Sequence, residues 1–226
     1  SLFTTRFSLV APGGTLLDGA LEAPAHVAFS PPAFVVRPGP LDGEIRFAQT
    51  PFALSPRDPD QVAVADGVVI LGGTTTDPAL LADLKLSFPN WVKLGRYQAD
   101  LQAHYGSSEI DPAREALLPS RGEDPGFARM GFQLTKNGSA VLSGSGHAPV
   151  LLSLVPFHLE LPVDVPLHVE ASGPSLELGD FDELLPADLG LGGTLSLQLA
   201  ADGPREALTF DGKIGLTSMT VNFAQG

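Results

Sequence analysis

Alternation of apolar and polar residues is the strongest pattern in this chain. From 157 to 171 ("FHLELPVDVPLHVEA") every odd position is apolar and every even position is polar, charged or proline. Side chains alternate between the two faces of a strand, so the segment predicts one apolar face and one polar face. Fifteen residues exceed a typical strand of about five or six. The pattern therefore predicts either a long edge strand, which Pro162 and Pro166 would suit, or two strands that meet near Asp164.

Short apolar runs elsewhere predict many more strands. They lie at 2–10, 25–30, 33–38, 43–49, 61–73, 82–106, 128–146, 193–203, 206–216 and 218–223. Asp66-Gly67 and Asn137-Gly138 each predict a hairpin turn, because these residue types readily adopt positive φ.

Helix signals are few and short. Asp77-Pro78 and Asp111-Pro112 each read as an N-cap followed by proline at the first helical position, which predicts one or two turns of helix over 77–84 and 111–119. Asp180 and Glu183 have the spacing of a capping box and predict a third short helix. The stretch at 119–126 ("PSRGEDPG") is the best candidate for a loop or an internal boundary.

Composition supports an all-β, mainly antiparallel fold. The 226 residues are 43% hydrophobic and include 25 glycines and 21 prolines, a combination of core and turn formers that favours many strands. An antiparallel sheet with one apolar face must cover that face. A closed β-sandwich covers it with a second sheet about 10 Å away, whereas an open sheet presents it to an apolar ligand.

Charge and cysteine content exclude several classes of function. The 26 acidic residues against 13 basic ones give a net charge of −13, which disfavours a nucleic-acid partner. The chain has no cysteine, so disulfides and thiolate metal sites are excluded. No apolar run is long enough for a membrane-spanning helix. The chain begins in mid-pattern and ends just after "MTVNF", so we expect 1–226 to be a single β-rich segment excised from a longer protein.

No constellation of catalytic residues is present in the sequence. Ser145 lies between Gly144 and Gly146 but lacks the outer glycines of a nucleophile elbow. Neither a phosphate-binding loop nor a dinucleotide fingerprint occurs. The sequence therefore predicts that the chain is not an enzyme, with no catalytic residues and no cofactor.

The best metal candidate is a doubled His-x-Glu, formed by His158 with Glu160 and His168 with Glu170. Each pair lies on one face of a strand and the two could meet in a hairpin, but the solvated face of an alternating strand explains them better, so no metal site is predicted.

Two further patterns have an ordinary explanation beside a functional one. The sequence Asn137-Gly138-Ser139 matches a glycosylation acceptor, but a hairpin turn already explains it. Trp91 and Tyr97 could stack on a sugar, but a single Trp beside a strand is more often part of the core.

The last fifty residues resemble the AsmA-like and TamB-like envelope proteins of Gram-negative bacteria. The resemblance is clearest over 176–223, where a short helical turn (Phe181 to Leu185) precedes alternating leucines and glycines. The members of the pattern are Leu191, Gly193, Leu195, Leu197, Leu199, Gly203, Leu208, Phe210, Gly212, Ile214, Leu216 and Val221. Residues 1–175 share only the style of alternating strands and Gly- and Pro-rich turns.

The resemblance implies a curved, taco-like open sheet with an apolar concave face and one to three very short helices. It further implies a periplasmic segment of a lipid-transport protein whose full length is anchored in the inner membrane. Such a segment would shield phospholipid acyl chains in a hydrophobic groove between the inner and outer membranes. The residues expected to line this groove are Phe157, Leu159, Leu161, Val163, Val165, Leu167, Val169, Leu195, Leu197, Leu199, Leu208, Phe210, Ile214 and Leu216.

Two alternative functions stay open at this point. One is a factor for assembly of outer-membrane proteins, which would offer a free strand edge to a β-barrel partner. The other is an extracellular β-sandwich that serves as a binding module.

Overall fold

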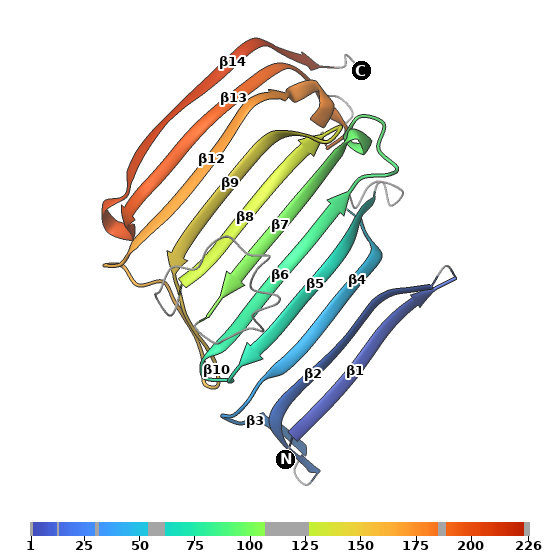
Figure 1. The fold of residues 1–226 in the computed structure, drawn as a ribbon, viewed down its shortest axis with the longest axis vertical. Coiled ribbons are helices and arrows are strands. Elements are labelled where there is room, and N and C mark those ends of the chain that lie inside the picture. The colour runs from blue at the N-terminus through green and yellow to red at the C-terminus, as the bar shows by residue number, and fades with distance from the viewer. Residues whose placement is uncertain are drawn as a thin grey trace.

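A computed structural model describes residues 2–12, 14–29, 32–53, 62–106, 127–184 and 189–223. Most of them form one 12-stranded antiparallel sheet in the order β1-β2-β4-β5-β6-β7-β8-β9-β12-β13-β14, with β3 paired to β2. Figure 1 shows these strands side by side in one layer, with β1 and β14 at opposite edges. The strands are β1 (Leu2–Ala11), β2 (Gly14–Phe29), β3 (Pro32–Val36), β4 (Asp42–Ala53), β5 (Val62–Gly73), β6 (Pro78–Ser87), β7 (Tyr97–Tyr105), β8 (Phe127–Lys136), β9 (Ser139–Pro149), β12 (Pro166–Glu177), β13 (Leu189–Pro204) and β14 (Thr209–Phe223).

A small second sheet and three 3-10 helices complete the described chain. The second sheet has two strands, β10 (Leu151–Leu154) and β11 (Phe157–Glu160). The helices are η1 (Leu94–Arg96), η2 (Leu178–Leu184) and η3 (Arg205–Ala207). The open, mainly antiparallel all-β fold and its very short helices are thereby confirmed. The closed β-sandwich is wrong, because the main sheet is one open layer and the second sheet has only two strands.

The turn at Asn137-Gly138 is confirmed as a hairpin. It joins β8 to β9, with Asn137 at φ 51° and Gly138 at φ 79°. Positive φ at both positions matches the right-handed twist of the flanking strands. The other predicted turn is wrong, because β5 passes straight through Asp66 and Gly67. Gly67 has φ 140° and lies opposite the register shift of β4.

The helix predicted over 77–84 is wrong. These residues lie mostly in β6, which pairs with β5 and β7 along its length. Pro78 occupies the first position of the strand, where its missing N–H is tolerated. A third short helix is confirmed as η2, but it begins at Leu178, so Asp180 lies in its first turn rather than at its N-cap. The helix over 111–119 and the boundary at 119–126 lie outside the described residues, although β7 and β8 on either side pair directly.

The alternating segment from 157 to 171 does not form one strand. Its first part is β11 in the small sheet, and its second part starts β12 at Pro166, between β9 and β13. Residues 161–165 form the bend between them. The prediction of two strands meeting near Asp164 is confirmed. The prediction of a long edge strand is wrong, because β12 is an interior strand of the main sheet.

Dense packing occurs where segments fold back over one end of the strands. Trp91, Leu94 and Tyr97 are buried there, and the Trp91 indole N–H donates to the carbonyl of Val62 over 3.0 Å. The partly buried side chains packed around them are Phe88, Leu134, Val141, Leu176 and Phe181. The alternative role of Trp91 and Tyr97 as a sugar-stacking pair is wrong, since both rings are inside this cluster with 4% and 3% exposure.

Candidate functional site

Two unbroken rows of nonpolar residues cross the whole sheet. Residues directly opposite each other on paired strands lie on the same face, so the registers define each row. From β1 to β14 the first row is Leu9, Leu17, Phe47, Gly67, Leu84, Leu101, Phe132, Gly144, Ala171, Leu199 and Gly212. The second is Phe7, Gly19, Ile45, Val69, Ala82, Ala103, Met130, Gly146, Val169, Ala201 and Phe210.

We call these two rows the apolar stripe. They pass through all eleven strands of the sheet path, and at about 4.8 Å per strand the stripe spans roughly 50 Å. Several of its large side chains remain in contact with solvent, including Phe210 at 79% exposure and Met130 at 65%. A contiguous exposed apolar surface of this extent is typical of a ligand or interaction site rather than of a surface in free solution.

Eight of the fourteen predicted lining residues come together on this face. Val169 and Leu199 lie within the stripe with Phe210, and Leu197 pairs with Ile214 beside it. Leu167, Leu195 and Leu216 extend the same face along β12, β13 and β14. The others lie elsewhere: Phe157 and Leu159 on β11, Leu161, Val163 and Val165 in the bend, and Leu208 between η3 and β14.

Sequence reasoning missed the part of the stripe from β1 to β9, which covers eight of its eleven strands. Its signal was present in the alternation of Leu84 and Leu86 or of Leu17 and Gly19. Without the registers, however, nothing showed that these runs continue the face of Leu199. The register of pairing, which sequence alone does not provide, aligns the runs into one surface.

Aromatic rings lie over glycines within the stripe. A Cβ added to Gly144 would lie 2.4 Å from Cε1 of Phe132, and one added to Gly19 would lie 2.4 Å from Cζ of Phe7. In each case the glycine sits directly opposite the aromatic residue on the next strand. The rings therefore lie against the backbone of the neighbouring strand, so they project little from the apolar stripe at these points.

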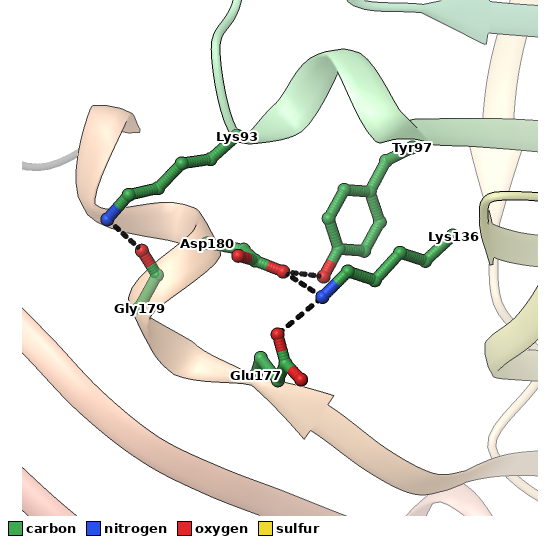
Figure 2. A network of polar contacts seen from close by, with 6 residues as sticks. All are labelled: Lys93, Tyr97, Lys136, Glu177, Gly179 and Asp180. Carbon is green, nitrogen blue, oxygen red and sulfur yellow. Dashed lines mark hydrogen bonds and ion pairs between the residues drawn. The ribbon is translucent and has the colours of Figure 1, made fainter.

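A polar latch holds η2 over one end of this face (Figure 2). The Tyr97 hydroxyl donates to Asp180 over 2.6 Å, and the Lys136 ammonium lies 2.5 Å from the same carboxylate and also contacts Glu177. Lys93 donates to the Gly179 carbonyl over 2.7 Å. The Phe181 ring packs 5.4 Å from that of Tyr97. Because Tyr97 and Lys136 are opposite each other on β7 and β8, the latch ties these strands to the β12–β13 connection.

The latch residues have shifted pKa values. Burial and the hydrogen bond to Asp180 raise the pKa of the Tyr97 hydroxyl. Burial opposes ionisation of Asp180, but hydrogen bonds from Lys136 and Tyr97 outweigh it and hold its pKa below the usual range. Asp182 has a lowered pKa, because it accepts from the backbone N–H of Leu191 over 2.7 Å and from Lys93. At neutral pH the Asp180 and Asp182 carboxylates are therefore ionised, and the Tyr97 hydroxyl keeps its proton.

The opposite face of the sheet, which we call the polar face, is richer in polar residues and carries one of the two His-x-Glu pairs. His168 contacts Asp202 on β13, which raises the pKa of its imidazole, and stacks on His147 with ring centroids 5.5 Å apart. His158 and Glu160 form their own 3.0 Å contact on β11, in the other sheet. The two pairs do not meet, and within the described ranges no group of three His, Cys, Asp or Glu side chains could hold a metal ion.

The polar face has a hollow lined by polar side chains. The hollow over β9, β12, β13 and β14 has a volume of about 580 Å³ and is lined by serine, carboxylate, glutamine and lysine side chains. Its Ser145 hydroxyl donates to Glu170 over 2.9 Å, and Ser143 and Ser172 contact each other at 3.3 Å. Each of these groups thus has a hydrogen-bond partner on a neighbouring strand.

The fold and the stripe define a class of protein: an open, single-layer antiparallel sheet with one continuous apolar face exposed to solvent. No family model matches the chain, and neither the curated proteins nor the solved structures gave a match. The resemblance noted over 176–223 stays a prediction. Among the residues that the structure places, no helix is long and apolar enough to cross a membrane.

Proposed function

We propose that this chain binds phospholipid acyl chains along the apolar stripe, as the periplasmic segment of a lipid-transport protein of the AsmA-like or TamB-like kind. In this proposal the full-length protein is anchored in the inner membrane, and the segment carries or shields lipid between the inner and outer membranes. The observation that carries the proposal is the stripe itself, in which nonpolar residues occupy every position of two rows across eleven strands.

The dimensions of the stripe fit lipid tails. A bilayer has a hydrocarbon core about 30 Å thick formed by two leaflets, so one tail extends about 15 Å. A stripe of roughly 50 Å accommodates about three such lengths end to end. Burial of a methylene contributes about 0.8 kcal/mol. A tail of about sixteen carbons lying on an open face, with half of its surface in contact, would gain on the order of 6 kcal/mol before association costs.

An acyl chain requires no specific side chain, only an uninterrupted apolar surface. This would explain why the stripe combines seven residue types, namely Leu, Phe, Gly, Ala, Ile, Val and Met, whose side chains share only the absence of charge and of hydrogen-bonding groups. The polar face, with Asp18, Glu170 and Asp211 at stripe-adjacent positions, would keep the sheet soluble while the other face carries lipid.

Native mass spectrometry tests the proposal. The purified chain is incubated with vesicles of phosphatidylethanolamine and phosphatidylglycerol, separated from them, and extracted for lipid. We expect bound phospholipid in the parent and loss of most of it in Leu197→Glu, which places a charge beside the stripe. Gln198→Glu is the matched control, because it adds the same charge one residue away on the opposite face. Absence of lipid from the parent, or equal loss in both variants, would contradict the proposal.

A second candidate function is assembly of outer-membrane proteins, and it is favoured by β1 and β14, each of which has a single partner strand among the described residues. An edge strand can accept a strand from a barrel protein by β-augmentation. A photo-crosslinking residue at Thr217 on β14 would capture a barrel protein in this case. Capture that persists in Leu197→Glu would separate this function from lipid binding.

A further inference from the structure

The edge strand β14 presents a straight segment to solvent. From Thr209 to Thr217 it pairs with β13 without a register shift, and in the described structure β13 is its only partner. The helix η3 precedes this segment, and the irregularity at Ser218, with φ 54°, follows it. Figure 1 shows β14 at the outer edge of the sheet. A straight edge of this kind offers a row of backbone N–H and C=O groups to another strand.

The side chains of this segment are self-complementary about Gly212. Asp211 and Lys213 flank it on the polar face, and Phe210 and Ile214 flank it on the apolar face. In an antiparallel copy centred on Gly212, Asp211 faces Lys213 and Phe210 faces Ile214, and each contact occurs twice. A register centred on Asp211 or on Lys213 would instead place two like charges opposite each other, which is unfavourable.

We propose that a second copy of this chain pairs antiparallel with β14 through a two-fold axis at Gly212. Opposite residues share a face, so the apolar faces of both copies lie on the same side of one doubled sheet. The first row of the stripe then continues from Leu199 through Gly212 of each copy into the first row of the second copy. Phe210 and Ile214, which are 79% and 63% exposed in one copy, gain an apolar neighbour across the junction. The inference goes beyond the proposed function and does not require lipid.

The other edge of the sheet is a poorer candidate. Arg6 is the only charged residue in β1, so two copies of β1 can form no opposite-charge pair. Pairing of β1 with β14 would be head-to-tail, and such contacts build open chains of molecules rather than a closed dimer. Charge complementarity therefore favours pairing of β14 with the β14 strand of a second copy. Because a two-fold axis closes this arrangement, assembly stops at two copies.

Sedimentation equilibrium of the 226-residue chain over a concentration series tests the proposal. We expect a monomer–dimer equilibrium whose dissociation constant rises at least tenfold in Lys213→Asp, because both charge pairs become repulsive. The charge-exchanged double variant Asp211→Lys/Lys213→Asp restores the pairs and should dimerise within threefold of the parent. Arg6→Asp on β1 is the control and should change nothing. A monomer at every concentration, open-ended assembly sensitive to Arg6→Asp, or no recovery in the double variant would overturn the proposal.

Disulfide trapping tests the register directly, because the chain has no cysteine. In a mixture of Asp211→Cys and Lys213→Cys, mild oxidation should crosslink one variant to the other. Either variant alone offsets its two cysteines by two residues along the pairing and should crosslink at least tenfold less. Preferential crosslinking within a single variant would refute an axis at Gly212.

Discussion

Replacement of Asp180 by alanine tests how strongly the latch holds η2. Its carboxylate accepts from the Tyr97 hydroxyl over 2.6 Å and lies 2.5 Å from the Lys136 ammonium. The Asp180 and Lys136 side chains are only 13% and 16% exposed, so water replaces these contacts poorly. Hydrogen bonds to charged groups contribute about 1.5–3 kcal/mol each. We expect Asp180→Ala to lower the free energy of unfolding by about 3 kcal/mol, and Tyr97→Phe by about 1.5 kcal/mol.

The pH dependence of this loss has a defined sign. The folded-state pKa of Asp180 lies below its unfolded value of about 3.9. Its contribution is therefore fully present above the unfolded pKa and is lost as the pH falls through the folded-state pKa. The difference in stability between the parent and Asp180→Ala should be largest near neutral pH and should shrink below about pH 4.

Trp91 is the reporter for both effects, because it is the only tryptophan and packs in the same cluster as Tyr97. Urea unfolding, followed by Trp91 fluorescence at pH 7 and at pH 3, gives the difference in unfolding free energy between the parent and each variant at the two pH values. Asp180→Ala/Tyr97→Phe should cost less than the sum of its single variants, since both remove one shared contact. A stability difference that is equal at pH 3 and pH 7, or strict additivity, would refute the assignment of the latch.

Two further predictions concern the two faces of the sheet. Gly144→Ala should lower the free energy of unfolding by about 1–3 kcal/mol, because the added Cβ meets the Phe132 ring. In a Phe132→Leu background, urea titration should show that part of this stability is recovered. Absence of any recovery would contradict the contact. Asp202→Asn should lower the pKa of His168 towards its ordinary value, because it removes the carboxylate that raises this pKa; an NMR titration that finds the pKa unchanged would show that the contact is absent.

Alternation correctly predicted which side chains share a face of the sheet where two apolar runs that follow each other in the sequence form paired strands. The runs at 193–203 and 206–216 became β13 and β14, and Leu197 lies opposite Ile214 as shared apolar faces require. A strand has a fixed period of two, so the face of each side chain follows from its position. The order of distant strands and their registers depend on contacts between segments, which a single run does not record.

Local turn and cap signals failed where tertiary pairing outweighed them. A capping residue contributes about 1 kcal/mol, whereas β6 pairs on both sides along its length and buries Ala79 and Leu81. The Asp66-Gly67 pair serves a bulge instead of a turn: the Asp66 carboxylate accepts from the backbone N–H of Gln49 over 2.9 Å, where Gln49 has φ 53°. The same two residue types that suit a hairpin thus suit the strand opposite a bulge.

The break in the 157–171 segment shows why alternation alone misplaced part of the site. The pattern stays in phase across the bend at 161–165, although β11 and β12 belong to different sheets. Phe157 therefore has the right periodicity for the stripe and the wrong location. A residue contributes to a surface of this kind only if its strand lies in the sheet and its register aligns it with apolar neighbours. Gly144 meets both conditions without a side chain, because the Phe132 ring covers it. Continuity of the stripe therefore depends on register more than on the hydrophobicity of any one residue, so a charge within a row should impair lipid binding more than the loss of any single large side chain.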